Sequence, residues 1–196
     1  MPNPNHTKTM KDIWRPGNMI YPLPAMLVSC GANEDEYNVF TASWVGTICS
    51  DPAMCYVSIR QSRHSYSIVK RNMAFTLNLT TEDLAKATDW CGVRSGRDYN
   101  KFHEMGLTAV KGIKVDAPYI DEAPMSIECR VKQIIHLGSH DMFIADVMNV
   151  LADTRYIDKD TGEFDLKKAG LLVYSHGEYF KMGDKIGNFG WSVKKK

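Results

Sequence analysis

The sequence predicts a single, mainly β domain that closes into a barrel and carries a few short helical insertions. Three observations support this prediction. The 196 residues are enough for one domain with a sizeable core. Short apolar runs of strand length recur along the chain, and residues typical of turns separate several of them. No internal repeat, low-complexity tract or clear linker divides the chain, so residues 1–196 are expected to form one domain.

The expected strands follow from these apolar runs. The first run follows Tyr21-Pro22-Leu23-Pro24, and such an extended proline segment favours entry into a strand. Two long segments flank Gly138-Ser139-His140-Asp141 and predict a hairpin. A further turn is expected at residues 158–162. The expected strands are residues 26–30, 55–59, 74–79, 125–137 and 142–152.

The expected helices are short. One begins near His64, after a polar loop. Thr80-Thr81-Glu82-Asp83 resembles a capping box, which predicts a second helix that runs to about Trp90. Residues 96–105 are polar apart from a few aromatic and apolar side chains, and they predict a third helix on the surface.

Charge and hydropathy exclude several classes of function. The net charge is +1, so no overall field favours nucleic acid or an anionic membrane. No uninterrupted apolar run approaches the roughly 20 residues of a membrane span. The segment Met1 to Lys11 is polar and lacks the apolar centre of a secretion signal. We therefore expect a cytoplasmic protein without nucleic-acid or membrane partners, and a solvated basic tail at residues 194–196.

The cysteines and histidines predict no metal site. The five cysteines are odd in number and scattered, without a CxxC pair, which argues against a disulfide framework or a zinc site. His103, His136 and His176 lack ligand spacing. Cys91 lies beside a glycine-rich loop, but no His or Asn partner is close in sequence, so it is interpreted as a structural thiol rather than a nucleophile.

The segment from Asn38 to Ser65 carries the strongest indication of a binding site. Small polar residues and a tryptophan, residues 41–44, come one strand-length before the Asp51-Pro52 turn. A β-rich run follows, and then the polar, basic loop from Arg60 to Ser65. This order suits a planar ligand with a phosphate, because an arginine donates paired hydrogen bonds to phosphate and a helix N-terminus adds free N–H groups. The alternative is a barrel hairpin with a solvated basic turn.

Several segments in a fixed order resemble one protein family. The motifs are Asn38-x-x-Thr41-Ala42-Ser43-Trp44, Ser50-Asp51-Pro52, Val57-Ser58-Ile59, Phe75-x-x-Asn78, Met125-x-Ile127-Glu128-Cys129, Gly138-Ser139-His140-Asp141 and Gly177-x-Tyr179-Phe180…Gly187-x-Phe189-Gly190. With these motifs the chain is similar to the flavin reductase-like group of FMN-binding split-barrel proteins, and its segment 90–102 and Phe189-Gly190 tail look most like flavoredoxins. The resemblance covers residues 21–190.

The resemblance implies a fold, a cofactor and a set of binding residues. The family fold is a Greek-key split β-barrel that dimerises, with FMN in a groove near the dimer interface. Residues that would line the flavin ring are Thr41, Ala42, Ser43, Trp44, Ser58, Ile59 and Arg60, with Asn78 near the ring. Residues that would hold ribityl and phosphate are Ser62, Arg63 and Ser65. Residues on a loop approaching the same pocket would be Cys91, Ser95, Asp98 and Lys101.

His140 bears on the electron donor. Nicotinamide-using members of the family carry a Gly-Asp-His turn here, whereas this chain reads Gly138-Ser139-His140. The histidine matches and the preceding acid does not, so NADH or NADPH as donor and a simple hairpin-capping role for His140 both stay open. We also expect His140 and Lys101 to lie at the open face of the pocket, where positive charge would speed the approach of a donor or partner.

Three classes of function remain open at this stage. The first is an FMN-dependent oxidoreductase that passes electrons from a reduced nicotinamide to a flavin, a metal ion or a small acceptor. The second is an electron carrier that exchanges electrons with a redox protein. The third is a split-barrel binding protein without redox activity. In each class a homodimer is expected, with its core formed by the aromatic residues Tyr174, Tyr179, Phe180, Phe189 and Trp191.

Overall fold

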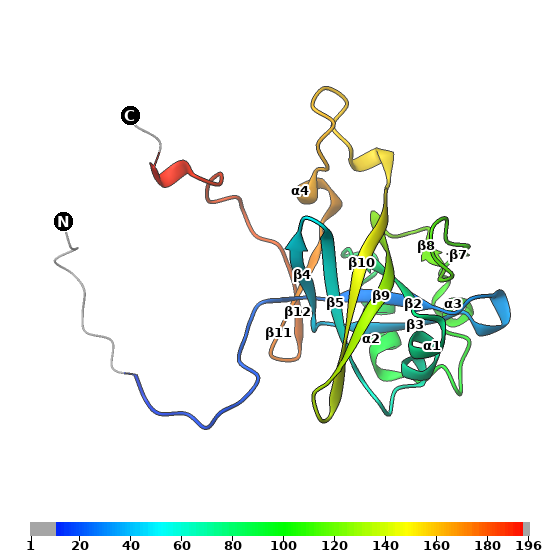
Figure 1. Ribbon diagram of the computed structural model, residues 1–196. Coiled ribbons are helices and arrows are strands. Elements are labelled where there is room, and N and C mark those ends of the chain that lie inside the picture. The colour runs from blue at the N-terminus through cyan, green and yellow to red at the C-terminus, as the bar shows by residue number, and fades with distance from the viewer. Residues whose placement is uncertain (1–10, 194–196) are drawn as a thin grey trace.

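The structure is a computed structural model that describes residues 11–193, and strands dominate it (Figure 1). The strands are β1 (Leu23–Pro24), β2 (Met26–Cys30), β3 (Asn38–Ala42), β4 (Val45–Ser50), β5 (Ala53–Arg60), β6 (Ala74–Leu79), β7 (Ala109–Val110), β8 (Tyr119–Ile120), β9 (Met125–His136), β10 (His140–Ala152), β11 (Leu172–Ser175) and β12 (Glu178–Lys181). The helices are α1 (His64–Asn72), α2 (Ala85–Val93), α3 (Lys101–Met105) and α4 (Leu166–Ala169), with short 3-10 turns at Glu34–Glu36, Thr154–Tyr156 and Trp191–Val193.

Seven strands form one antiparallel sheet in the order β3-β2-β6-β9-β10-β5-β4. Its two edge strands, β3 and β4, are consecutive in the chain and are joined only by Ser43 and Trp44. The sheet must therefore curl until its edges approach each other. The backbone N–H of Ser58 in β5 donates to the Trp44 carbonyl at 2.9 Å, which holds this corner closed. The expected barrel is confirmed.

The barrel interior and one outer face are both apolar. Interior side chains such as Phe40, Val57, Phe75 and Phe143 form the main core. Successive side chains of a strand point to opposite faces, so the neighbours Leu27 and Val39 point outward, where they pack with α2 and α3 in a second cluster. The helices α2 and α3 therefore cover β2 and β3.

Five of the seven strands of the large sheet agree with the sequence-based expectations, and β3 and β4 were not among the expected strands. β2 and β6 have the predicted bounds, and β9 and β10 form the predicted long hairpin. β10 also pairs with β5, and this register places His140 opposite Arg60. Two segments that are distant in the sequence, the β9–β10 turn and the end of β5, therefore meet at one end of the barrel.

Two helix predictions were wrong in detail. α1 begins at His64 as expected, but α2 begins at Ala85 and makes no use of the predicted capping box. The Thr80 hydroxyl donates to the Ala25 carbonyl instead, and Thr81 forms a β-bridge with Leu171, so tertiary contacts occupy both residues. α3 spans only Lys101–Met105; it lies at the surface as expected, with His103 and Glu104 exposed, but its first two residues are buried.

β1, β11 and β12 form a separate three-stranded sheet beside the barrel. Residues 11–20 and 182–193 extend from this side of the molecule, away from the barrel (Figure 1). No helix among residues 11–193 is long and apolar enough to cross a membrane. Residues 1–10 and 194–196 lie outside the described part of the chain, and with them the expectations for the N-terminal segment and the lysine tail.

Candidate functional site

Two adjoining cavities open where β3, β5, β10 and the α2–α3 loop meet. The first, which we call the aromatic cavity, has a volume of about 440 Å³ and is lined by Phe40, Thr41, Ala42, Ser43, Trp44, Ser58, Ile59, Arg60, Arg63, Asp89, Gly92, Val93, His140, Tyr174, Gly177 and Tyr179. The second, the basic cavity, has a volume of about 540 Å³ and is lined by Phe40, Arg60, Ser62, Arg63, His64, Ser65, Arg94, Ser95, Gly96, Arg97 and Lys101. They share Phe40, Arg60 and Arg63, so a ligand can span both.

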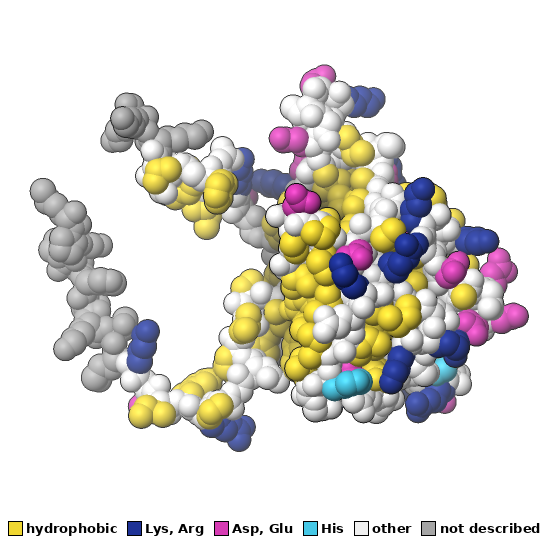
Figure 2. All heavy atoms as spheres, viewed as in Figure 1, with side chains coloured by type: hydrophobic (Ala, Val, Ile, Leu, Met, Phe, Trp, Pro, Cys, Tyr) yellow, Lys and Arg dark blue, Asp and Glu magenta, His cyan; other side chains and the backbone are white. Residues whose placement is uncertain are grey.

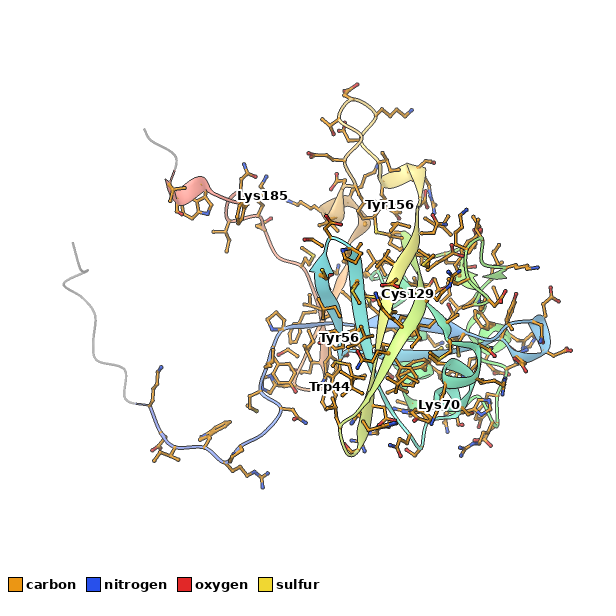
Figure 3. All side chains as sticks on the ribbon, viewed as in Figure 1. Trp44, Tyr56, Lys70, Cys129, Tyr156 and Lys185 are labelled. Carbon is orange, nitrogen blue, oxygen red and sulfur yellow. The ribbon has the colours of Figure 1, made fainter. Side chains whose placement is uncertain are left out.

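The aromatic cavity is walled by flat and small side chains. The Trp44 and His140 rings lie 4.5 Å apart and tilted by 43°, at the mouth between the β3–β4 corner and the β9–β10 turn. Trp44 is labelled in Figure 3. Tyr174 and Tyr179 of the small sheet also line the aromatic cavity. Such a slot accepts a planar, largely apolar group.

Helix α2 approaches this cavity closely because a glycine permits it. A Cβ atom at Gly92 would lie 3.2 Å from the Cβ of Thr41. The Thr41 hydroxyl donates to the Thr88 carbonyl and so ties β3 to α2. This contact fixes the distance between two walls of the cavity.

The basic cavity is enclosed by two loops that face each other. The β5–α1 loop contributes Arg60, Ser62 and Arg63, and the α2–α3 loop contributes Arg94 and Arg97. An Arg97 Nη2 to Ser62 carbonyl contact of 3.5 Å links the two loops. Of the eleven lining residues, five are Arg or Lys and none is Asp or Glu. Among residues 11–193, no ion pair engages any of these five cations.

Helix α1 begins at this cavity with free backbone donors. Its N-cap residue is Arg63, whose side chain makes no capping hydrogen bond. The first N–H groups of a helix lack partners within the helix and favour an anion. Ser65, in the first turn, is buried and accepts a hydrogen bond from Asn38 Nδ2 at 2.7 Å, so its place is fixed.

Lys101 occupies a different position from the expected one. Its side chain is only 4% exposed, and Nζ donates to the Cys91 carbonyl at 2.7 Å. Burial lowers the pKa of Lys101 to about 8, so most of the population stays protonated at pH 7. Lys101 therefore contributes charge to the inner wall of the basic cavity and does not lie at an open face.

Three expected site residues line neither cavity. Asn78 is fully buried and is used by the fold: its Nδ2 donates to the Leu27 carbonyl at 2.9 Å, and its Oδ1 accepts from the Ile120 N–H at 3.0 Å. The backbone carbonyl of Cys91 accepts the hydrogen bond from Lys101, while burial raises the pKa of its thiol to about 11. Asp98 lies in the exposed α2–α3 loop. All other expected residues line one of the two cavities.

Several lining residues were missed by the sequence analysis. Arg94 and Arg97 flank the expected Ser95, and two arginines bracketing Ser95-Gly96 in a polar loop were a signal that could have been used. Tyr174 and Tyr179, which were expected in a dimer core, line the aromatic cavity of this chain, and their place in a dimer stays a prediction. Nothing in their local sequence indicates this, because the β11–β12 hairpin reaches the cavity only through tertiary packing.

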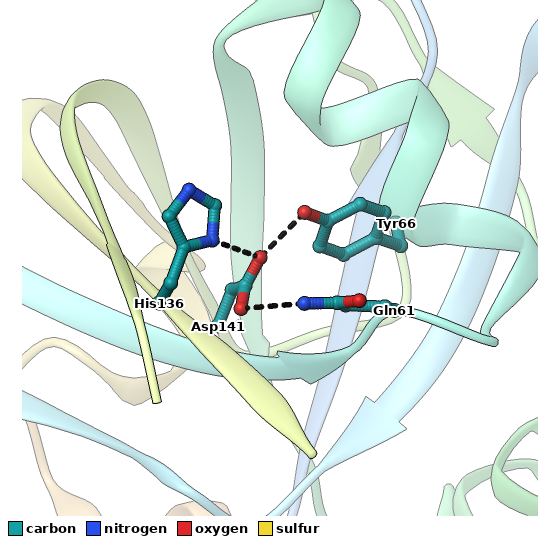
Figure 4. A network of polar contacts seen from close by, with 4 residues as sticks. All are labelled: Gln61, Tyr66, His136 and Asp141. Atoms are coloured by element: carbon teal, nitrogen blue, oxygen red, sulfur yellow. Dashed lines mark hydrogen bonds and ion pairs between the residues drawn. The ribbon is translucent and has the colours of Figure 1, made fainter. Parts of the chain in front are cut away.

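A buried carboxylate connects the β9–β10 hairpin to the loop of the basic cavity (Figure 4). Asp141 is fully buried, and it accepts hydrogen bonds from Gln61 Nε2 at 3.0 Å and from the Tyr66 hydroxyl at 2.5 Å. His136 Nδ1 lies 2.8 Å from the same carboxylate. These hydrogen bonds, led by that from Tyr66, lower the pKa of Asp141 to about 2. Gln61 lies between Arg60 and Ser62, so this network fixes both cavities relative to each other.

The local electrostatics keep two histidines neutral. Burial lowers the pKa of His140, and Arg60 and Arg63 lower it further. Burial, Arg97 and Lys101 act in the same way on the pKa of His64. The lowered pKa favours the neutral form of His140, which can offer a hydrogen bond at the aromatic cavity, and it disfavours the charge expected there.

Comparison with known proteins identifies the family. Residues 18–183 match the flavin reductase-like domain model, and the chain belongs to that family. A protein of Archaeoglobus fulgidus is 30% identical over 161 residues, 82% of this chain and 88% of its own. The flavoredoxin of Desulfovibrio vulgaris (Miyazaki F) is 31% identical and superposes with a TM-score of 0.87 over 94% of this chain and 100% of its own.

The fold comparison confirms the predicted architecture. A protein from Shewanella frigidimarina, described as a flavin reductase with a split barrel domain, matches 85% of this chain and 85% of its own with a TM-score of 0.76 at 20% identity. The seven-stranded antiparallel sheet with its unpaired β3 and β4 edges is therefore the split barrel that the sequence predicted.

Proposed function

We propose that this chain binds one FMN and transfers electrons through it. The observation that carries the proposal is the junction of a planar, aromatic cavity with a cavity that holds five cations and no carboxylate. A phosphorylated flavin has this same division between a flat ring system and an anionic end. Membership of the flavin reductase-like family supports the assignment.

The donor set fits FMN at both ends. In the aromatic cavity the β3–β4 corner and β5 would hold the ring, with backbone groups and small side chains facing its polar edge. In the basic cavity Ser62, Arg63 and the start of α1 would hold the phosphate by charge-assisted hydrogen bonds. The cavities meet at Arg60 and Arg63, where the ribityl chain would pass.

When bound, FMN supplies the acceptance and release of electrons. The residues of this chain contribute orientation, charge and exclusion of water. Tyr174 and Tyr179 cover one side of the aromatic cavity, and Arg60 and Arg63 place positive charge beside it. Positive charge near a bound flavin favours its reduced, more negative form.

We further propose that electrons come from NADH or NADPH, which would approach at His140. His140 lines the aromatic cavity and lies against Trp44, so an approaching nicotinamide would meet it first. The Ser139 hydroxyl lies 2.9 Å from His140 Nδ1, which holds the ring in place. The second candidate is a carrier that takes electrons from a redox protein, and the serine in place of an acid before His140 favours it.

Titration of the protein with FMN and with riboflavin tests the cofactor. A charge-assisted contact to phosphate contributes about 1.5–3 kcal/mol, so we expect FMN to bind roughly ten- to a hundredfold more tightly than riboflavin. Equal affinities would remove the phosphate role of the basic cavity. A protein that binds neither flavin would favour the non-redox alternative.

Stopped-flow reduction with NADH and with NADPH separates the enzyme from the carrier. Rapid reduction by either nucleotide supports an oxidoreductase, with a flavin, a metal ion or another small molecule as acceptor. Slow reduction by both supports a carrier for a redox protein. In the enzyme case, His140→Ala should keep its FMN and accept electrons more slowly, while His176→Ala, a histidine outside both cavities, serves as the control.

We also propose a homodimer. The terminal segments carry exposed apolar side chains, with Ile186 and Phe189 almost fully exposed and Trp14 76% exposed. Hydrophobic side chains also gather over β4 and β5, on the side that faces these segments (Figure 2). Exposed apolar surface of this extent indicates an interaction site. Light scattering at micromolar concentration should give twice the chain mass; the monomer mass would contradict the proposal.

A further inference from the structure

The basic cavity has more space and charge than one phosphate requires. Its volume of about 540 Å³ exceeds the 440 Å³ of the aromatic cavity, which would take the much larger ring system. A phosphate monoester carries a charge of about −2 at neutral pH. Five cations line the basic cavity, so about three positive charges remain beyond that phosphate.

The surplus cations lie on one side. Arg60 and Arg63 line both cavities and are in reach of a phosphate that is connected to a ring in the aromatic cavity. Arg94 and Arg97 line only the basic cavity and come from the opposite loop. The first phosphate therefore belongs with the β5–α1 loop, and the α2–α3 loop retains two guanidinium groups.

Both of these arginines keep donors available. The guanidinium carbon of Arg94 lies 5.7 Å from the centroid of the Tyr99 ring, and such a cation–π contact does not consume the N–H donors of the guanidinium. Arg97 makes the single 3.5 Å contact with the Ser62 carbonyl. Within residues 11–193, neither has a carboxylate partner in an ion pair.

The field at the cavity supports a net positive charge. His64 lies in its wall, where burial lowers the pKa of His64 most, Arg97 and Lys101 lower it further, and Asp98 raises it. Asp98 is a single carboxylate beside the five cations of the lining. An arginine pair with free donors in such a field is suited to a phosphate group.

We propose that Arg94 and Arg97 form a second anion subsite, which binds a further phosphate group of a diphosphate-bearing ligand while the first phosphate position is filled. The inference rests on the proposed function, because a flavin phosphate must occupy the first position. The further phosphate belongs either to a dinucleotide electron donor bound beside FMN or to FAD bound in place of FMN.

The test is calorimetric titration of the FMN-loaded protein with inorganic pyrophosphate, with flavin fluorescence recorded to follow FMN retention. We expect about one pyrophosphate to bind per chain with FMN retained. Arg94→Gln and Arg97→Gln should each weaken pyrophosphate binding about tenfold and change FMN affinity by less than threefold. Arg71→Gln is the matched control, because Arg71 lies on α1 in an ion pair with Glu36 at 2.9 Å.

Three results would overturn the inference: no pyrophosphate binding to the FMN-loaded protein, release of FMN as pyrophosphate binds, or equal pyrophosphate affinity in the glutamine variants. Each of these results is obtained on a protein that has already bound FMN, so it does not contradict the proposed function. A chain that binds no flavin at all would instead defeat the proposed function.

Competition experiments identify the source of the further phosphate. If NADH or NADPH displaces pyrophosphate from the FMN-loaded protein, the subsite serves the donor. If FAD binds more tightly than FMN to the parent protein, and Arg94→Gln and Arg97→Gln abolish this difference in affinity, the subsite serves the flavin. If the affinities of NADH, NADPH and FAD are all unchanged by these two substitutions, the assignment to a diphosphate-bearing ligand is overturned.

Discussion

The aromatic cavity and the basic cavity adjoin, but they offer a ligand different interactions. The aromatic cavity presents flat rings, small side chains and one carboxylate, Asp89, beside the two shared arginines. The basic cavity presents five cations, two buried or half-buried serines and the start of a helix. The first can bind by shape and burial of apolar area, and the second by charge.

This difference predicts that the two cavities would hold the two halves of a flavin phosphate independently. FMN and riboflavin share the ring and differ in the phosphate, so their affinity ratio reports the basic cavity alone. A substitution at the proposed phosphate position, formed by Ser62, Arg63 and the start of α1, should change the ratio, and one at a residue that lines only the aromatic cavity should leave it unchanged. The predictions below use this ratio, from the largest expected effect to the smallest.

Arg63→Ala should have the largest effect, because it removes a cation shared by both cavities. FMN affinity should fall about ten- to a hundredfold, the equivalent of 1.5–3 kcal/mol, and riboflavin affinity should change little. Fluorescence titration with both flavins measures this. Arg71→Ala, on the same helix but paired with Glu36, is the control. An equal loss for both flavins would mean that Arg63 acts on the ring.

Gly96→Ala should disturb the basic cavity through the backbone. An added Cβ would lie 2.8 Å from Asn38 Cγ and 2.9 Å from His64 Cδ2, so the α2–α3 loop must move outward. We expect the free energy of unfolding to fall by about 1–3 kcal/mol and the FMN to riboflavin ratio to decrease. Gly183→Ala is the control, since nothing lies within 4 Å of its Cβ position. An unchanged ratio would show that the loop position does not affect phosphate binding.

Asp141→Asn should loosen the link between the two cavities. The pKa of Asp141 is about 2 in the folded protein, below the ordinary carboxyl value, so its contribution to stability is present above about pH 4 and is lost as the pH falls through 2. Thermal unfolding at pH 7 should show a midpoint a few degrees lower than in the parent. The difference between the unfolding midpoints of the parent and of Asp141→Asn should become smaller between pH 4 and pH 2.

The control for this substitution lies on the same strand. Asp146→Asn removes a partly exposed carboxylate paired with Lys132 at 3.5 Å, and such pairs contribute little to stability. Its unfolding midpoint should stay near that of the parent. A gap for Asp141→Asn that does not depend on pH would mean that the carboxylate charge is not the source of the stabilisation.

Trp44→Leu should have the smallest effect and should leave the ratio unchanged. The substitution removes an aromatic surface and its contact with His140 at the mouth of the aromatic cavity. Loss of one aromatic contact costs about 0.5–1.5 kcal/mol, so both flavins should bind roughly two- to tenfold more weakly. A loss confined to FMN would contradict the division between the two cavities.

The predicted strands and the observed ones agree where local pattern decides the structure. β2 is defined by a short apolar run after an extended proline segment, and β6 by another such run, so both have the expected bounds. The loop from Arg60 to Ser65 was expected in a binding site, because its arginines, serines and following helix are contiguous in sequence, and it lines the basic cavity.

The errors occur where a local pattern competes with distant partners. Thr80 and Thr81 form the start of a plausible capping box, but contacts with Ala25 and Leu171 take both residues into the sheet network. Asn78 was also assigned to the wrong role, because its side-chain amide forms hydrogen bonds with β2 and with the segments around Ile120 and Ser126. A polar residue on a strand carries no local sign of which partner it will find.

The sequence by itself determined five of the seven barrel strands, the long hairpin and the basic, hydroxyl-bearing character of one loop, because each depends on residues close together in the chain. The tertiary structure decided which segments face that loop. Arg97 reaches Ser62 across 35 residues and Gln61 reaches Asp141 across 80, and the β11–β12 tyrosines close the aromatic cavity from the far end of the chain. Contacts over such separations depend on strand order and burial, which no local pattern specifies.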